Sequence, residues 1–330
     1  MKNIVIFIDG TGQDRSQQEL AGQTNVSRLC SACSNFDKQK VHYYNGVGTG
    51  VGESILGSAF GVGLEERILR AYSFLQQEVG IARQQNEEYH IYLFGFSRGA
   101  FAVRWLAELL EFSGVPAFGV SERLGVVNLI KGKKDDAETL RKQGKYYDAD
   151  IRFIGVWDTV QSTLTQDFGI ASLPRNVTAA YHAMALDEYR AKFPVSRFNK
   201  DSRVKEVWFA GCHADVGGGY ADGRATADCA LEWISNAAKR YGLLVNDDVL
   251  STNDQSLKPV IHDELKAAGL IGFLWRAINF FKGEKRIVRE IKPNDVVHWS
   301  VSFFASNYSI NHVQSLVACT EEPRTFANIA

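Results

Sequence analysis

Six short runs of apolar, β-branched and aromatic residues recur along this chain, with stretches of helical periodicity between them. Each run is almost continuously hydrophobic and does not alternate with polar residues, which is typical of strands covered on both faces. The pattern therefore predicts a doubly wound α/β fold with a mostly parallel sheet and helices on both faces. The six runs are residues 3–9, 40–46, 90–96, 150–158, 204–211 and 296–304.

Helices are predicted where apolar residues recur at three-to-four spacing. The four main stretches are residues 64–80, 98–112, 176–192 and 226–241. A further helix is expected around Cys30 and Cys33. Because no second cysteine pair follows at zinc-site spacing, we interpret these two thiols as buried core groups.

The chain is expected to form one domain over residues 1–330. It has 330 residues, 45% of them hydrophobic, which is enough to bury a large core. Residues 114–149 are rich in Lys and Asp and predict a surface insertion. Residues 46–63 are rich in glycine and predict a flexible connection, since they contain neither the P-loop nor the dinucleotide-binding pattern.

The charge balance and the hydropathy narrow the classes of partner. The formal net charge is −1, from 37 basic and 38 acidic residues, which does not favour nucleic acid. The N-terminal apolar run is too short for a signal peptide and no cleavage site follows it, so we expect synthesis in the cytoplasm without Sec export. No window reaches the roughly 18 consecutive apolar residues of a spanning helix. Any membrane contact is therefore expected at the surface.

The pentapeptide GFSRG places Ser97 between a predicted strand and a predicted helix. In a G-x-S-x-G turn the glycines permit close backbone packing, and the serine hydroxyl projects at the carboxyl end of the sheet. The order of strand, turn and helix favours Ser97 as a nucleophile over a small residue in a tight turn. The expected fold is therefore α/β-hydrolase-like.

A serine nucleophile needs a base, and the base needs a third group that fixes its tautomer. In α/β-hydrolases these groups follow in the order Ser, Asp or Glu, His. Asp158 ends one predicted strand, and His213 follows another. Because open α/β sheets place their sites at the carboxyl ends of the strands, we predict a triad of Ser97, Asp158 and His213.

Three competing residues stay open at this point. Asp215, two residues after His213, is an alternative orienting carboxylate, and His298, in the last predicted strand, is an alternative base. His182 lies in the predicted helix 176–192, where a buried structural histidine is the more common outcome.

An oxyanion hole requires two backbone N–H groups. One is expected from Arg98, directly after the nucleophile, and the other from Gly10 or Thr11 in the loop after the first strand. Asp9 precedes this loop, and its carboxylate would repel an oxyanion. We interpret Asp9 as a side-chain cap of the turn or as a residue that holds Arg98 in place. The chemistry requires no metal and no organic cofactor.

Several segments, in order, resemble the motifs of a bacterial and fungal α/β-hydrolase family that includes type VI secretion phospholipase effectors. The resemblance covers about residues 3–245. It rests on the segments IFIDGTG, QTNVSRL, HYYNGVGTG, GFSRGAFAVR, FIGVWDTV, YHAMALDEYRAKF and VWFAGCHADVGGGY.

This resemblance implies hydrolysis of glycerophospholipid esters by a Ser-Asp-His triad, which maps onto Ser97, Asp158 and His213. It also implies a phospholipid substrate at a membrane surface, an immunity protein or a secretion-machinery carrier as partner, and export by type VI secretion to a target cell envelope. Two alternatives stay open: an esterase or thioesterase acting on a soluble substrate, and a non-catalytic module that binds a lipid or a protein.

Residues 255–295 are expected to form a C-terminal lid or membrane-contact segment. Within them, residues 269–286 concentrate aromatic and aliphatic side chains ahead of a basic end. Such a stretch is typical of an interfacial helix or of a lid over a lipid-binding cleft. An ordinary core helix is the alternative interpretation.

Overall fold

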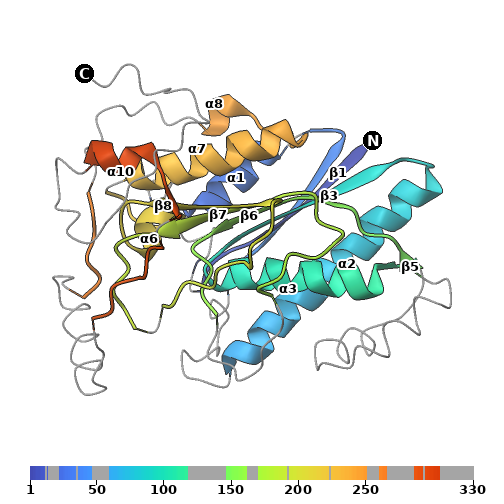
Figure 1. The fold of residues 1–330 in the computed structure, drawn as a ribbon. Coiled ribbons are helices and arrows are strands. Elements are labelled where there is room, and N and C mark those ends of the chain that lie inside the picture. The colour runs from blue at the N-terminus through green and yellow to red at the C-terminus, as the bar shows by residue number, and fades with distance from the viewer. Residues whose placement is uncertain are drawn as a thin grey trace.

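The centre of the fold is a seven-stranded sheet in which all neighbouring strands run parallel (Figure 1). The spatial order is β2 (Gln39–Tyr44), β1 (Lys2–Ile8), β3 (Tyr89–Phe96), β6 (Ile151–Trp157), β7 (Ala180–Ala185), β8 (Val204–Phe209) and β9 (Val296–Val297). The computed structural model describes residues 1–11, 13, 22–34, 36–46, 59–117, 146–161, 170–191, 193–222, 224–250, 260–265, 286–292 and 294–304.

Helices cover both faces of the sheet, as the continuous hydrophobicity of the strands predicts. Helices α2 (Ala59–Gln84) and α3 (Arg98–Ser113) lie on one face, and α1 (Asn25–Cys33) and α7 (Arg224–Arg240) lie on the other (Figure 1). Strand β1 shows the cause, because its side chains alternate between the two layers. Ile4, Ile6 and Ile8 pack with α2 and α3, whereas Val5 and Phe7 pack with α1 and α7.

Shorter elements complete the described part of the chain. Strands β4 (Val115–Pro116) and β5 (Tyr146–Tyr147) pair antiparallel, so the predicted insertion 114–149 begins and ends at neighbouring positions. Residues 118–145 of this insertion lie outside the described residues. The remaining helices are α6 (His213–Gly217), α8 (Asp247–Leu250) and α10 (Trp299–Phe304).

Two predictions of secondary structure are wrong. The predicted helix 176–192 contains strand β7, whose six residues are all buried between β6 and β8. Its sequence, AYHAMA, is rich in helix-favouring Ala and Met, and the neighbouring strands override that preference. The predicted strand 296–304 forms only the two residues of β9 and then helix α10. A short apolar run does not distinguish a buried strand from a buried helix.

The glycine-rich segment and the C-terminal segment are described only in part. Residues 59–63, predicted as part of a loop, already belong to α2, and residues 47–58 lie outside the described residues. Of the predicted lid or membrane-contact segment 255–295, the structure describes 260–265, 286–292, 294 and 295. The apolar stretch 269–286 therefore lies outside the described residues, except for Arg286.

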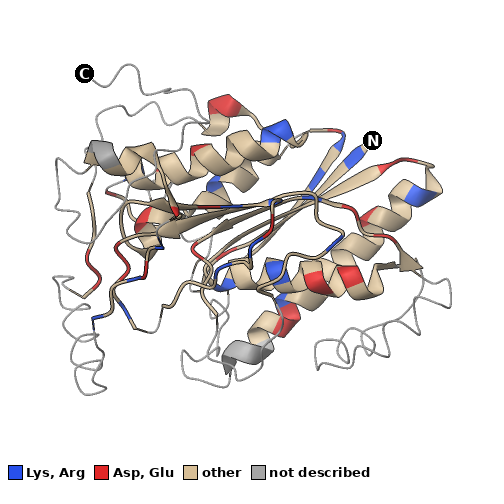
Figure 2. Cartoon of the chain, in the orientation of Figure 1, with Lys and Arg blue, Asp and Glu red and all other residues tan. Residues whose placement is uncertain are grey.

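Acidic and basic residues occur on both helical layers (Figure 2). Within the described ranges, no helix is both long enough and apolar enough to cross a bilayer.

Candidate active site

Ser97 occupies a sharp turn between strand β3 and helix α3. Its backbone angles are φ +58° and ψ −122°, a conformation that costs a non-glycine residue about 1–3 kcal/mol. A hydrogen bond joins the turn to the neighbouring strand β6, in which Trp157 O accepts from Ser97 N at 3.0 Å. The side chain is buried at the carboxyl edge of the sheet, as a G-x-S-x-G turn requires.

The two glycines that flank Ser97 are required by backbone contacts. A Cβ at Gly95 would lie 2.5 Å from Gly99 O, and a Cβ at Gly99 would lie 2.1 Å from Ile8 O. Both distances are far shorter than a carbon–oxygen contact allows. The first turn of α3 therefore packs directly on the backbone of β3 and on the end of β1, and glycine is needed at both positions.

Asp158 and His213 meet at the same edge of the sheet. His213 begins α6, and its Nδ1 lies 2.6 Å from Asp158 Oδ2. Val160 N, two residues after this aspartate, donates to Ser97 O at 3.4 Å. The His213 ring packs against Phe96, the residue before the serine, with ring centroids 4.5 Å apart. The structure thus brings the three predicted triad residues together where β3, β6 and β8 end.

The carboxylate of Asp158 is fully buried and accepts four hydrogen bonds. Oδ1 accepts from Ala185 N at 3.0 Å and from Arg289 Nη1 at 2.5 Å, while Oδ2 accepts from His213 Nδ1 and from Arg289 Nη2 at 3.0 Å. Burial alone would raise the pKa of Asp158, but the Arg289 charge and the His213 contact outweigh it and hold the pKa well below the usual range. Asp158 is therefore an anion at every physiological pH.

His213 is almost completely buried between aromatic rings. Phe193 lies on a second side of the imidazole, edge to face, with centroids 5.2 Å apart. Burial lowers the pKa of His213, and the hydrogen bond and charge of Asp158 offset this only in part. The imidazole is therefore neutral near pH 7. With Nδ1 hydrogen-bonded to Asp158, Nε2 is the nitrogen that can accept a proton.

The alternative carboxylate and the alternative bases bind other partners. Asp215 accepts from His262, whose Nδ1 lies 2.6 Å from Asp215 Oδ1. His298 Nδ1 lies 2.8 Å from Ser300 Oγ, and its ring stacks on Phe209.

His182 is a buried histidine of strand β7. Its Nδ1 lies 3.0 Å from Glu206 Oε1, and its Nε2 accepts from Thr159 N at 3.1 Å. Both ring nitrogens are used, which fits the structural role expected for it.

Asp9 organises the loop expected to supply an oxyanion donor. Its buried carboxylate accepts from Gly10 N at 2.7 Å, from Thr24 Oγ1 at 2.5 Å and from Tyr43 Oη at 2.5 Å. Burial raises the pKa of Asp9 to about 6, although these hydrogen bonds oppose the rise. Asp9 therefore caps its own turn. The Gly10 N–H, one of the two expected alternatives for an oxyanion donor, thus points to Asp9.

Residues around His213 include groups that the sequence analysis did not assign. Glu188 Oε2 accepts from His213 N at 3.3 Å, and Arg190 binds both oxygens of Glu188. These residues follow β7 in a segment that the analysis used only as a motif. Arg289 was missed as well, since it lies 131 positions from Asp158 with no pattern to link them.

The described residues include no metal-binding cluster, and their cysteines are buried. Among them, no group of three or more His, Cys, Asp or Glu side chains is placed to hold a metal ion. Cys30 and Cys33 are buried thiols, as predicted.

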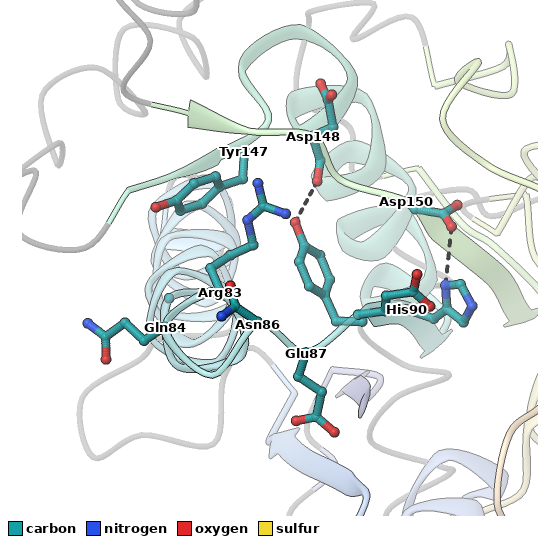
Figure 3. Close-up of a pocket in the computed structure, with 11 residues that line it drawn as sticks. Arg83, Gln84, Asn86, Glu87, His90, Tyr147, Asp148 and Asp150 are labelled. Carbon is teal, nitrogen blue, oxygen red and sulfur yellow. Dashed lines mark hydrogen bonds and ion pairs between the residues drawn. The ribbon is translucent and has the colours of Figure 1, made fainter. Parts of the chain in front are cut away.

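A cavity of about 850 Å³ lies at the other end of the sheet (Figure 3). It is lined by the end of α2 and the beginning of β3, including Arg83, Tyr89 and His90. Inside it, Tyr89 Oη donates to Asp148 O at 2.8 Å. Because β3 begins at Tyr89 and reaches Ser97 only at its opposite end, this cavity is separate from the candidate active site.

A parallel sheet between helical layers, with a serine elbow and a buried Asp–His pair at its carboxyl edge, defines the α/β-hydrolase class. Within this class, a family model described as "T6SS, Phospholipase effector Tle1-like, catalytic domain" matches residues 2–237. The chain belongs to this family.

Individual relatives have low sequence identity to this chain. A curated relative, the uncharacterized protein YEL023C of Saccharomyces cerevisiae, is 29% identical over 227 residues, which cover 58% of this chain and 32% of the relative. The Tle1 effector, solved bound to the VgrG spike of the type 6 secretion system, is 19% identical, with a TM-score of 0.42, 66% of this chain and 51% of that chain covered. An uncharacterized protein from Pseudomonas aeruginosa is 16% identical, with a TM-score of 0.46, 84% and 50% covered. The chain thus spans about a third of the length of the curated relative and about half of each solved chain.

Replacing Gly99 with alanine is expected to destabilise the fold, because the new Cβ would press against the Ile8 carbonyl. Overpacking of this kind costs about 3 kcal/mol, which exceeds the roughly 1 kcal/mol that alanine gains in a helix. Urea denaturation of Gly99→Ala measures the loss. Gly22→Ala is the control, since a Cβ there meets its nearest atom at 3.8 Å. Equal stability of the two variants would contradict the packing argument.

The imidazole of His213 is expected to titrate below pH 6.5, the ordinary midpoint of histidine, because its pKa is lowered by burial. His262 should titrate above 6.5, because the hydrogen bond to Asp215 raises its pKa. The folded state binds the His213 proton less readily than the unfolded chain does, so this residue reduces stability as the pH falls below 6.5. NMR titration measures both midpoints, with His213→Asn and His262→Asn to assign the signals. A reversed order of the two midpoints would contradict the expected directions of the two pKa shifts.

Proposed function

We propose that this chain is a serine ester hydrolase of the phospholipase A type, with Ser97 as nucleophile, His213 as base and Asp158 as orienting carboxylate. The observation that carries the proposal is the 2.6 Å contact of His213 Nδ1 with the buried Asp158 carboxylate, next to a serine in a strained turn. Membership of a phospholipase effector family supports the same chemistry.

The proposed reaction begins at the acyl carbonyl of the substrate. Ser97 Oγ attacks this carbon while His213 Nε2 takes the hydroxyl proton, and Asp158 stabilises the imidazolium that forms. Collapse of the tetrahedral intermediate breaks the ester bond, and the imidazolium protonates the departing alcohol, here a lysophospholipid. Water then attacks the acyl-enzyme with the same base, which releases the fatty acid and restores the Ser97 hydroxyl.

The oxyanion of the intermediate is assigned to two backbone donors. Arg98 N directly follows the nucleophile and lies in the first turn of α3. Thr11 N is the second donor, because the Gly10 N–H is held by Asp9. The β1 loop is close enough for this role, since a Cβ at Gly10 would lie 3.4 Å from Ser97 Cβ.

The substrate, partners and location are proposed from the family membership. The proposed substrate is a glycerophospholipid met at a membrane surface. The proposed route is export by type VI secretion, with a spike protein of the VgrG kind as carrier and an immunity protein as a second partner. Membership of a T6SS phospholipase effector family supports the substrate class and the export route.

Replacing Ser97 with alanine is expected to reduce fatty-acid release from mixed phospholipid vesicles by at least about 10³-fold, because the nucleophile is lost. Ser73→Ala is the matched control, since this serine is exposed on α2. Circular dichroism checks that both variants are folded.

Three other results would contradict parts of the proposed function. Full hydrolysis by folded Ser97→Ala would refute the nucleophile. Turnover of short-chain esters or thioesters without turnover of vesicles would replace the phospholipid by a soluble substrate. Lipid binding without any turnover, and without covalent labelling by a fluorophosphonate, would identify a binding module.

A further inference from the structure

Arg289 reaches the candidate active site from the C-terminal part of the chain, beyond residues 2–237 that the family model matches. The segment that carries Arg289 runs beside the residues that follow β7. The backbones of Arg286 and Arg190 form an isolated antiparallel β-bridge, and Ile287 N donates to Tyr189 O at 2.9 Å. The Arg289 side chain is buried, with 9% of the residue exposed. A cation is thus brought to the triad by a segment remote from it in sequence.

The guanidinium of Arg289 binds Asp158 through two parallel hydrogen bonds. Nη1 lies 2.5 Å from Oδ1 and Nη2 lies 3.0 Å from Oδ2. The same nitrogens donate to Ala185 O and Phe193 O, each at 2.8 Å. Such a planar fork fixes the rotation of a carboxylate more tightly than one hydrogen bond does. The oxygen that His213 contacts, Oδ2, is therefore also held by Arg289.

The charged groups near His213 are compensated to different degrees. Asp158 is compensated by Arg289, whereas Arg190 is shared by Glu188, which contacts the His213 backbone, and Glu264, at 3.5 Å. His182, on β7, is paired with Glu206. Within the group of His213, Asp158 and Arg289, protonation of His213 therefore adds a net positive charge, whereas without Arg289 the same proton would neutralise Asp158.

We propose that Arg289 is a positioning residue of the triad, which fixes the orientation of the Asp158 carboxylate and keeps the His213 imidazole neutral between turnovers. The catalytic part of this inference rests on the function proposed above. A neutral imidazole is the form that accepts the serine proton, so Arg289 extends the active range of the site toward acidic pH.

Two variants separate the effect of the Arg289 charge on His213 from its effect on the orientation of the Asp158 carboxylate. Arg289→Gln removes the charge, so the NMR midpoint of His213 should rise by about one pH unit or more, and the acidic limb of kcat/KM should move up with it. Arg289→Lys keeps the charge without the fork, so the midpoint should stay within about half a unit of the wild-type value. Both variants should lose about 10²-fold in kcat with little change in KM, because the base is misplaced.

Arg203→Gln is the matched control. Arg203 also binds a carboxylate, Asp201, together with backbone carbonyls, but it lies before β8, at the end of the sheet opposite to His213. Loss of a structural tie alone should therefore lower stability in this variant and leave the His213 midpoint unchanged.

The possible results are distinguishable. An unchanged His213 midpoint in Arg289→Gln would overturn the charge effect, and an unchanged kcat in Arg289→Lys would overturn the positioning role. If Arg289→Gln does not fold, Arg289→Lys still tests the orientation through kcat. A wild type without turnover or fluorophosphonate labelling would refute the proposed function and the catalytic role of Arg289, while a raised midpoint in Arg289→Gln would still uphold the charge effect.

Discussion

The buried carboxylate of Asp158 is the interaction on which the site depends. Its two oxygens accept from the backbone of β7, from the imidazole of His213 and from the guanidinium of Arg289. A carboxylate removed from water in this way is stable only when its charge is compensated and its lone pairs are used. Asp158 therefore connects three parts of the chain that are remote in sequence, and each of them is held at the carboxyl edge by that shared anion.

The parallel sheet supplies the rest of the geometry. Because all neighbouring strands run in one direction, the residues that follow β3, β6 and β8 emerge at one edge. Glycine at positions 95 and 99 allows α3 to make backbone contact with the strands, and Ser97 lies between them in a turn with positive φ. Asp9, directly after β1, accepts hydrogen bonds from Thr24 and Tyr43 and so fixes the loop that follows this strand. The site thus follows from close backbone packing as much as from its polar groups.

The sequence predicted the features that depend on local patterns. Apolar runs located the strands that precede Ser97, Asp158 and His213, and the pentapeptide motif with the order of these residues along the chain predicted that they share one edge of the sheet. Strand β7 was missed because its alanines and methionine favour helix, and only its place between two strands decides otherwise. The pairing of Asp215 with His262 and the role of Arg289 could not be predicted, because such contacts depend on tertiary structure and carry no periodic signal.

The late position of Arg289 has a consequence for how the protein is made. A nascent chain that has emerged from the ribosome as far as β8 and α6 already contains Ser97, Asp158 and His213, together with six of the seven strands of the described sheet. It lacks the cation that compensates Asp158, and burial of an uncompensated carboxylate costs several kcal/mol. The ion pair of Asp158 with Arg289 therefore forms only after residue 289 has been translated, and a chain stalled before it has six of the seven strands but lacks this pair.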